Sequence, residues 1–210
     1  MKQLIYFALL IPFITFAQRN YLDEGNKLLS QNKNKEAEEI FKEALNSEKY
    51  NLIYQTQLGL SLINQKKYSE AEKQLEKVLS KDPNNTAALW YSGINNFQNA
   101  KNFRKAVMYF EKAYPFISKS SPQFFAVNFF IGKSYRNLLY TEGLTYEETS
   151  RMLETSKEYI RLQPSASDAD QFISFIKYVE ENRFPSNVKK WRVINENDPE
   201  ELINKELERK

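Results

Sequence analysis

The chain has 210 residues, of which 41% are hydrophobic and 27% are charged, a composition typical of a single folded unit of ordinary globular type. The net charge of +3 is small, and acidic and basic residues are mixed along the chain, which argues against a nucleic-acid binder. Cysteine and histidine are both absent. This excludes Cys/His zinc sites, thiol nucleophiles and histidine acid–base catalysis, and we expect no catalytic residue, no metal and no cofactor.

Residues 1–17 have the pattern of a secretory signal peptide. Lys2 supplies a positive charge, an apolar run extends from Leu4 to Phe16, and the sequence Thr15-Phe16-Ala17 has small residues at the −3 and −1 positions of a cleavage site. The run is shorter than the ~20 residues that a membrane-spanning helix needs, and Pro12 interrupts it. We therefore expect an exported protein, periplasmic or secreted, with no stable membrane insertion after cleavage. An uncleaved N-terminal membrane anchor shares this pattern and is the alternative.

Four of the five glycines recur at a nearly constant spacing, each inside a predicted helix. They are 34, 34 and 39 residues apart: Gly25, Gly59, Gly93 and Gly132. A glycine within a helix costs about 1 kcal/mol relative to alanine, so its recurrence indicates close packing at that position. Small residues follow the first three glycines by 12, 12 and 13 residues: Ala37, Ala71 and Ala106. A period near 34 with small residues at fixed offsets is typical of a helical repeat array.

The first three predicted units are helix pairs that cover about 18–51, 52–85 and 86–118. In the first unit, helices near 20–32 and 35–48 flank the polar turn Asn32-Lys33-Asn34. Asp82-Pro83 ends the second unit, because proline lacks the N–H that would continue the helix. The third unit has one extra residue in its internal turn.

The fourth unit, about 121–164, is degenerate. Ser121-Pro122 opens a long helix, and Gly143 marks its exit. Thr145 and Glu148 then form a predicted capping box for the next helix. Met152, Ser156 and Tyr159 fill the small-residue positions of that helix, so we expect looser or differently angled packing there.

A further helix, about 168–182, is expected to cap the hydrophobic end of the array. The polar tail, 183–210, carries a short basic and aromatic cluster, Lys189-Lys190-Trp191-Arg192, that is too small for specific binding to a membrane or nucleic acid. We expect this tail to fold back or to stay mobile. Asp198 is a suitable cap for a short helix within it.

The pattern of the second unit resembles the tetratricopeptide repeat (TPR) family. The residues that carry the resemblance are Leu58, Gly59, Leu62, Tyr68, Ala71, Leu75 and Pro83. The resemblance covers about 18–164, strongly for three repeats and weakly for the fourth. It implies an all-α, right-handed superhelical solenoid of about four antiparallel helix pairs with a C-terminal capping helix. In that family the first helices of the pairs line a concave groove.

The same resemblance implies which side chains would form a groove for a protein or peptide partner. They are Leu22, Asn26, Gln57, Leu60, Trp90, Tyr91, Ile94, Phe97, Phe129, Lys133 and Arg136. One TPR subclass clamps the C-terminal carboxylate of chaperones, but here Leu22, Gln57, Ala87 and Tyr91 replace residues that the clamp needs. The large aromatic residues have an alternative role, because they could pack between neighbouring repeats or under the capping helix.

These observations predict a non-enzymatic adaptor of the cell envelope that binds a protein or peptide partner in the concave groove and has no nucleic-acid partner. The alternative is an accessory domain of an envelope hydrolase, or a weak hydrolase that uses carboxylates. Self-association through unshielded repeat ends is a further prediction.

Overall fold

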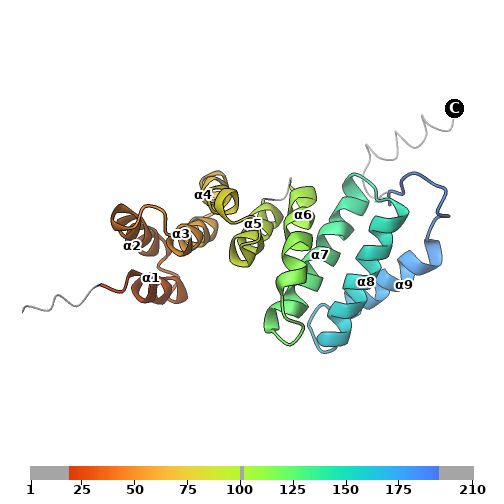
Figure 1. Cartoon of the computed structure of the whole chain (residues 1–210). Helices are drawn as coiled ribbons and strands as arrows, with labels where there is room; N and C mark the ends of the chain where they lie inside the picture. Colours follow the sequence, from red (N-terminus) through yellow and green to blue (C-terminus); the bar gives the residue numbers. More distant parts are fainter. Residues whose placement is uncertain (1–18, 100–101, 194–210) are drawn as a thin grey trace, which may run out of the picture.

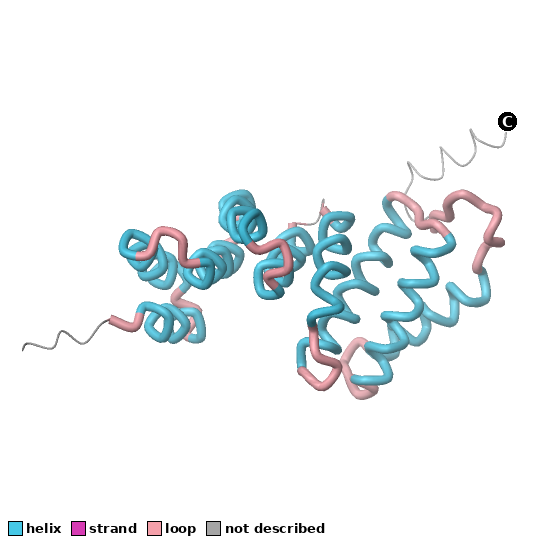
Figure 2. Tube along the Cα trace, viewed as in Figure 1, coloured by secondary structure: helices cyan, strands magenta, loops and turns pink. Residues whose placement is uncertain are grey.

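The computed structural model describes residues 19–99 and 102–193, and in this part of the chain the helices form an elongated array (Figure 1). The order is α1 (Tyr21–Ser30), α2 (Asn34–Ser47), α3 (Leu52–Asn64), α4 (Tyr68–Lys81), α5 (Thr86–Gln98), α6 (Phe103–Ala113), the 3-10 turn η1 (Tyr114–Phe116), α7 (Pro122–Thr141), α8 (Tyr146–Leu162) and α9 (Ala169–Asn182). Short loops connect them (Figure 2). The predicted all-α class and the pairing of helices are confirmed.

Local interactions explain where the helices begin. The Asn51 side chain accepts hydrogen bonds from the backbone of Ile53 and Tyr54 and so caps α3. The predicted capping box of α8 is present in both directions: the Thr145 hydroxyl accepts from the Glu148 amide, and the Glu148 carboxylate accepts from the Thr145 amide. These bonds satisfy amides that no helical carbonyl can reach.

The turns within the first two pairs share one geometry. Asn32 and Lys66 adopt left-handed backbone conformations, with φ of 57° and 60°. The next amide, that of Lys33 or Lys67, donates to a carbonyl five residues earlier at 2.9 Å in each pair. This arrangement satisfies the last carbonyls of a helix and reverses the chain within three residues.

The recurring glycines allow the two helices of a pair to approach each other. A Cβ atom added at Gly59 would lie 2.8 Å from Leu75, and one added at Gly93 would lie 2.5 Å from the Phe110 ring. The three alanines at the fixed offsets are fully buried: Ala37, Ala71 and Ala106 are each 0% exposed. The packing reason predicted for the repeated glycines is therefore confirmed.

The fourth pair, α7 and α8, is closely packed, so the looser packing, one of the two expected outcomes, is wrong. Met152 and Ser156 are buried in α8. A Cβ atom at Gly132 would lie 3.4 Å from the Ser156 backbone nitrogen. A serine opposite the glycine brings the backbones together, where the earlier pairs insert a large side chain.

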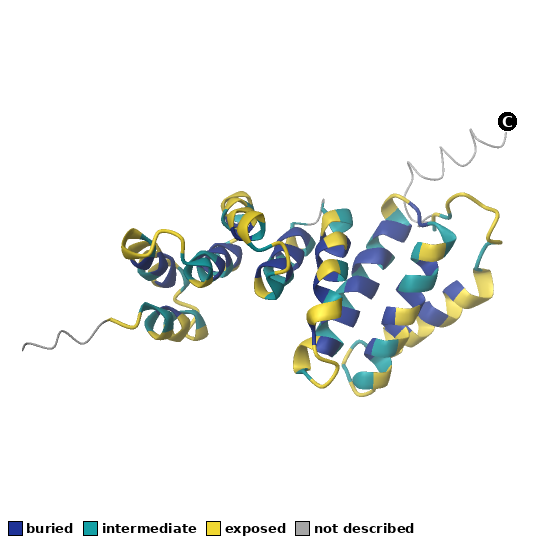
Figure 3. Ribbon diagram, viewed as in Figure 1, coloured by how far each residue is buried: buried dark blue, intermediate teal, exposed yellow. Residues whose placement is uncertain are grey.

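Buried residues follow the seam between the helices along the whole array (Figure 3). One hydrophobic cluster joins α2 to α5, and a second joins α5 to α9. Leu79 and Ile94 pack against both clusters, so that the core is continuous from pair to pair. Among the described residues, no helix combines the length and the hydropathy needed to cross a bilayer.

Residues 183–193 fold back onto the connection between α7 and α8, one of the two behaviours expected of the tail. The backbones of Leu144 and Trp191 exchange two hydrogen bonds of 2.8 Å. The Arg183 guanidinium lies 3.7 Å from the centre of the Tyr146 ring. The predicted signal peptide, 1–17, and the predicted helix from Asp198 lie outside the described residues.

Candidate interaction surface

The predicted groove residues all lie on the first helices of the four pairs, α1, α3, α5 and α7. Neighbouring first helices contact one another, α1 with α3 and α3 with α5, so they form one side of the array. This side is called the first-helix face below. Asn26 is exposed on it, and the other ten are partly buried: Leu22, Gln57, Leu60, Trp90, Tyr91, Ile94, Phe97, Phe129, Lys133 and Arg136.

The predicted residues of the first two pairs lie at the surface, where each is exposed or partly buried. Leu22 packs against the buried core between α2 and α5. Ile53, which lies on the same helix as Gln57, leaves 55% of its surface exposed. This half of the first-helix face is therefore a mixed polar and apolar surface.

The aromatic residues of α5 pack against α6 and α7. The Trp90 ring lies 5.5 Å from Phe110 and 5.8 Å from Phe130, and Phe97 lies 5.1 Å from Phe130, each edge to face. Such pairs contribute about 0.5–1.5 kcal/mol beyond the area that they bury. Phe97 thus packs between pairs three and four, the alternative role that the sequence left open.

The predicted residues of α7 lie beside the capping helix α9. Phe129 lies 5.8 Å from Phe172 of α9, and the Lys133 ammonium lies 4.8 Å from the Phe129 ring. The Arg136 guanidinium stacks over Phe175 of α9 at 4.4 Å. These cation–π contacts engage both basic residues with the protein's own rings.

 Trp90 and Tyr91 also line a cavity of about 440 Å³, which lies where α5 and α7 begin. The rest of its wall comes from the connection between α6 and α7, in particular Phe116 and Ile117. Phe116 leaves 51% of its surface exposed. We call this hollow the aromatic cavity.

Sequence reasoning missed Phe116 and Ile117 as members of this site. Both follow Pro115, and η1 is the turn that directs them back toward α5. An apolar residue on each side of a proline at the end of a repeat is the only local signal that marks this segment. Its position beside Trp90 depends on the way in which pairs three and four stack.

Two helices begin at the aromatic cavity. Thr86 and Ala87 of α5 line it, as does Gln123 in the first turn of α7. The Asn85 side chain caps α5 by accepting from the Ala88 amide, whereas no side chain caps α7. Helix N-termini favour negatively charged or hydrogen-bond-accepting groups. Burial raises the pKa of Tyr91, so that its hydroxyl stays neutral at physiological pH.

The acidic side chains offer no arrangement for metal-dependent chemistry in the described part of the chain, where no group of three or more acidic residues could hold a metal ion. Glu148 caps its own helix, α8, and binds Arg104 of α6. Glu111 binds Arg151 at 2.8 Å. These carboxylates stabilise contacts between neighbouring helices.

Comparisons with known proteins match part of the chain to a repeat family. Residues 28–92 match the family model of the tetratricopeptide repeat. Similar solved structures include a double mutant of MamA RS-1 (20% identity, TM-score 0.61, covering 77% of this chain and 84% of that chain). Another is MamA 41-end from Desulfovibrio magneticus RS-1 (18% identity, TM-score 0.56, covering 79% and 96%). A third is a putative kinesin light chain with TPR-like repeats from Podospora anserina (13% identity, TM-score 0.50, covering 77% and 95%).

A search of curated proteins finds no match to the chain. At these identities the structural likeness shows the fold, and together with the family match it confirms the tetratricopeptide resemblance and the solenoid architecture. Repeats of this type generally serve as non-enzymatic scaffolds for protein–protein interaction.

Proposed function

We propose that this tetratricopeptide-repeat solenoid is an exported interaction scaffold that binds a protein or peptide partner on its first-helix face, with the aromatic cavity as the anchor. The observation that carries the proposal is the exposed Phe116 beside Trp90 and Tyr91, around a hollow of about 440 Å³. Tryptophan and tyrosine are among the residues that most often dominate binding energy at interfaces.

The shape and chemistry of the cavity favour a bulky apolar side chain as the anchoring group of the partner. Its wall is mostly aromatic and aliphatic, and Ser118, Ser121 and Gln123 supply polar groups at the edge. The two helix N-termini favour an acceptor or a carboxylate next to that apolar side chain. A partner segment with an aromatic or large aliphatic residue beside an acidic one fits this arrangement.

The remainder of the first-helix face suits a longer contact. Asn26 and Ile53 are exposed on α1 and α3, so a partner anchored at α5 could extend along the earlier repeats. The opposite direction is closed, because α9 packs over Phe129 and Arg136. We therefore propose that a bound segment runs from the aromatic cavity toward α1.

Export is the second part of the proposal and rests on residues 1–17. Their positive charge, apolar run and small residues before Gln18 support cleavage by a signal peptidase. The intact mass of the protein recovered from its native compartment tests this part. A chain that begins at Gln18 is expected, and a chain that retains its N-terminus would favour the membrane-anchor alternative.

Partner binding is tested by a photoreactive amino acid placed at Phe116 of the full chain in its native host. A specific crosslinked partner is expected, and the Tyr91→Ala variant should reduce its yield. The matched control places the same group at Met108, which is 40% exposed on α6 and does not line the cavity. Equal crosslinking from both positions, or none from Phe116, would contradict the proposed site.

A further inference from the structure

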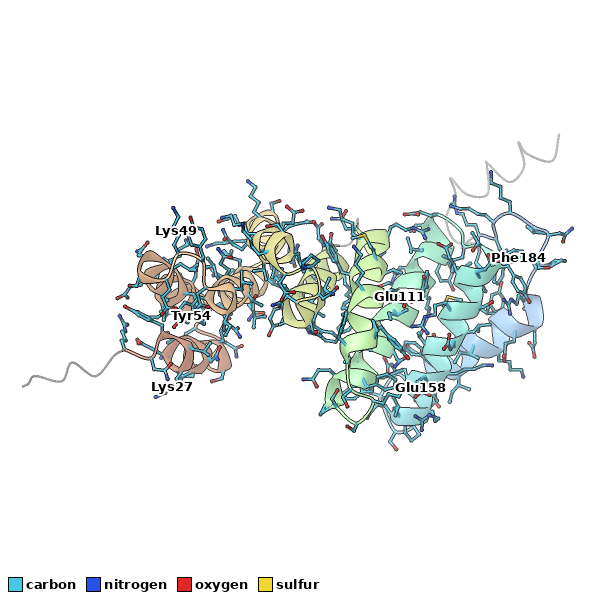
Figure 4. The ribbon with its side chains drawn as sticks, in the orientation of Figure 1. Lys27, Lys49, Tyr54, Glu111, Glu158 and Phe184 are labelled. Carbon is cyan, nitrogen blue, oxygen red and sulfur yellow. The ribbon has the colours of Figure 1, made fainter. Side chains whose placement is uncertain are left out.

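A second cavity lies away from the first-helix face, among the first two repeats. It measures about 780 Å³ and is bounded by the end of α2, the start of α3 and the second half of α4. Because α2 and α4 are the second helices of their pairs, this cavity opens on the side opposite to the proposed groove. In Figure 4, Lys49 at the end of the first pair lies on the α2 side of the array, and Lys27 lies on the α1 side. We call this hollow the lysine cavity.

The lysine cavity combines an apolar floor with a basic rim. Leu45, Tyr50 and Leu52 supply apolar surface, and Tyr50 is 76% exposed. The rim carries three lysines: Lys49 from the loop after α2, and Lys77 and Lys81 from α4. An exposed apolar surface bordered by charge is typical of an interaction site.

The three lysines are not neutralised by the part of the protein that the structure describes. Within residues 19–99 and 102–193, none of them forms an ion pair. The Lys49 ammonium lies 5.8 Å from the Tyr50 ring, and Lys77 donates a hydrogen bond to Gln74 at 3.2 Å. The nearby acid Glu48 accepts from Asn51 instead. The cavity thus carries three lysine charges that form no ion pair within the described residues.

We propose that the lysine cavity binds the C-terminal segment 194–210 of a second copy of the chain. The sequence of this segment has six acidic residues and three basic ones. In this segment two acidic residues stand directly before two apolar ones: Glu200, Glu201, Leu202 and Ile203. The cavity likewise has lysines next to apolar side chains. Charge complementarity of this kind sets the partner and the register of an interface.

The positions of the segment and the cavity in the array set the geometry of such a contact between copies. The described chain ends at Val193, whose amide donates to the Leu139 carbonyl, so the segment starts beside the end of α7. The lysine cavity belongs to α2, α3 and α4, near the other end of the array (Figure 1). A contact between the last repeat of one copy and the first repeats of the next is head-to-tail, and it produces rings or open chains. This inference does not depend on the partner proposed for the first-helix face.

The test measures self-association of the full chain by sedimentation velocity over a range of concentrations. We expect concentration-dependent association that weakens when the salt concentration rises, because solvent-exposed charges are screened. Lys77→Glu should weaken it about tenfold by reversing one contact in the rim. The matched control is Lys73→Glu, because Lys73 is exposed on the same helix, forms no ion pair in the described chain and does not line the cavity. This control should associate like the wild type.

A charge exchange identifies the occupant. The cavity variant carries Lys77→Glu and Lys81→Glu, and the tail variant carries Glu200→Lys and Glu201→Lys. Each variant alone should lose association, and the chain that carries all four changes should regain it. A chain that stays monomeric at all concentrations overturns the proposal. So does association that is as strong in Lys77→Glu as in the wild type, and so does a charge exchange that fails to restore it. Circular dichroism of each variant verifies that the helices remain intact.

Discussion

The buried carboxylate Glu38 provides a sharp test of how the first two repeats are held together. It lies on α2, and only 5% of the residue is exposed. Lys42, one turn along the same helix, binds it, and two groups of the next repeat donate to it at 2.8 Å: the Gln65 amide and the Lys67 ammonium. Removal of the negative charge would therefore leave two lysines without their anionic partner and would replace one acceptor oxygen by an NH2 donor.

The magnitude follows from the pKa of Glu38. Burial raises this pKa, but the hydrogen bonds from Lys42, Lys67 and Gln65 outweigh burial and lower it from 4.5 to about 2. Such a shift corresponds to at most about 3 kcal/mol of stability. Both lysine side chains are more than a third exposed, so that solvent screening reduces the expected contribution to about 1–2 kcal/mol. Because the folded pKa is lowered, this stability is present above about pH 4.5 and is lost as the pH falls toward 2.

Urea unfolding of Glu38→Gln at several pH values measures the effect. At pH 7 the variant should lose about 1–2 kcal/mol in its free energy of unfolding, and the difference from the wild type should shrink between pH 4.5 and pH 3. Glu39→Gln, at the exposed neighbouring position, serves as control and should change stability by less than about 0.5 kcal/mol. A Glu38→Gln variant as stable as the wild type at pH 7, or a difference that is independent of pH, would refute the reasoning.

Three other substitutions test the packing. Gly93→Ala should lower the free energy of unfolding by about 1–3 kcal/mol although alanine favours helices, because the new methyl group would lie 2.5 Å from the Phe110 ring; thermal melts measure this. Gly143→Ala should cost about 1–2 kcal/mol, because φ is +75° and the Trp191 carbonyl is 2.9 Å from the new atom; hydrogen exchange should accelerate at the amide bonded to that carbonyl. Trp90→Ala should cost about 3 kcal/mol or more in urea unfolding, because Trp90 packs against two phenylalanine rings.

The features that the sequence predicts well are local or periodic. The capping box joins Thr145 and Glu148, only three positions apart, so its formation depends little on the rest of the chain. The glycine opposite a large side chain recurs with the repeat, and the period alone reveals it. The helix pairs follow from the same signals, because each turn is a short and self-contained structure.

The features that the sequence does not predict require distant segments to meet. Trp191 pairs with Leu144, 47 residues earlier, through backbone groups that carry no sequence signal. Phe116 reaches the aromatic cavity only because η1 turns the chain between pairs three and four. The lysine cavity likewise needs α2 and α4 side by side, and neither helix alone suggests it. The loose packing expected of the fourth pair was wrong because the effect of Met152 and Ser156 depends on what lies opposite them.

The solenoid architecture makes the two candidate surfaces separable. In a repeat array each unit contacts mainly its neighbours, so a substitution in one repeat changes distant repeats little. Lys77 belongs to the second pair, and Phe116 follows the third, on a different cavity. Changes at the two positions should therefore have additive effects on stability and independent effects on self-association and partner capture. If Lys77→Glu also reduced crosslinking from Phe116, the two surfaces would be coupled, either through the packing of α4 on α5 or through assembly of copies. Sedimentation of that variant distinguishes the two, because only the second requires a change in association.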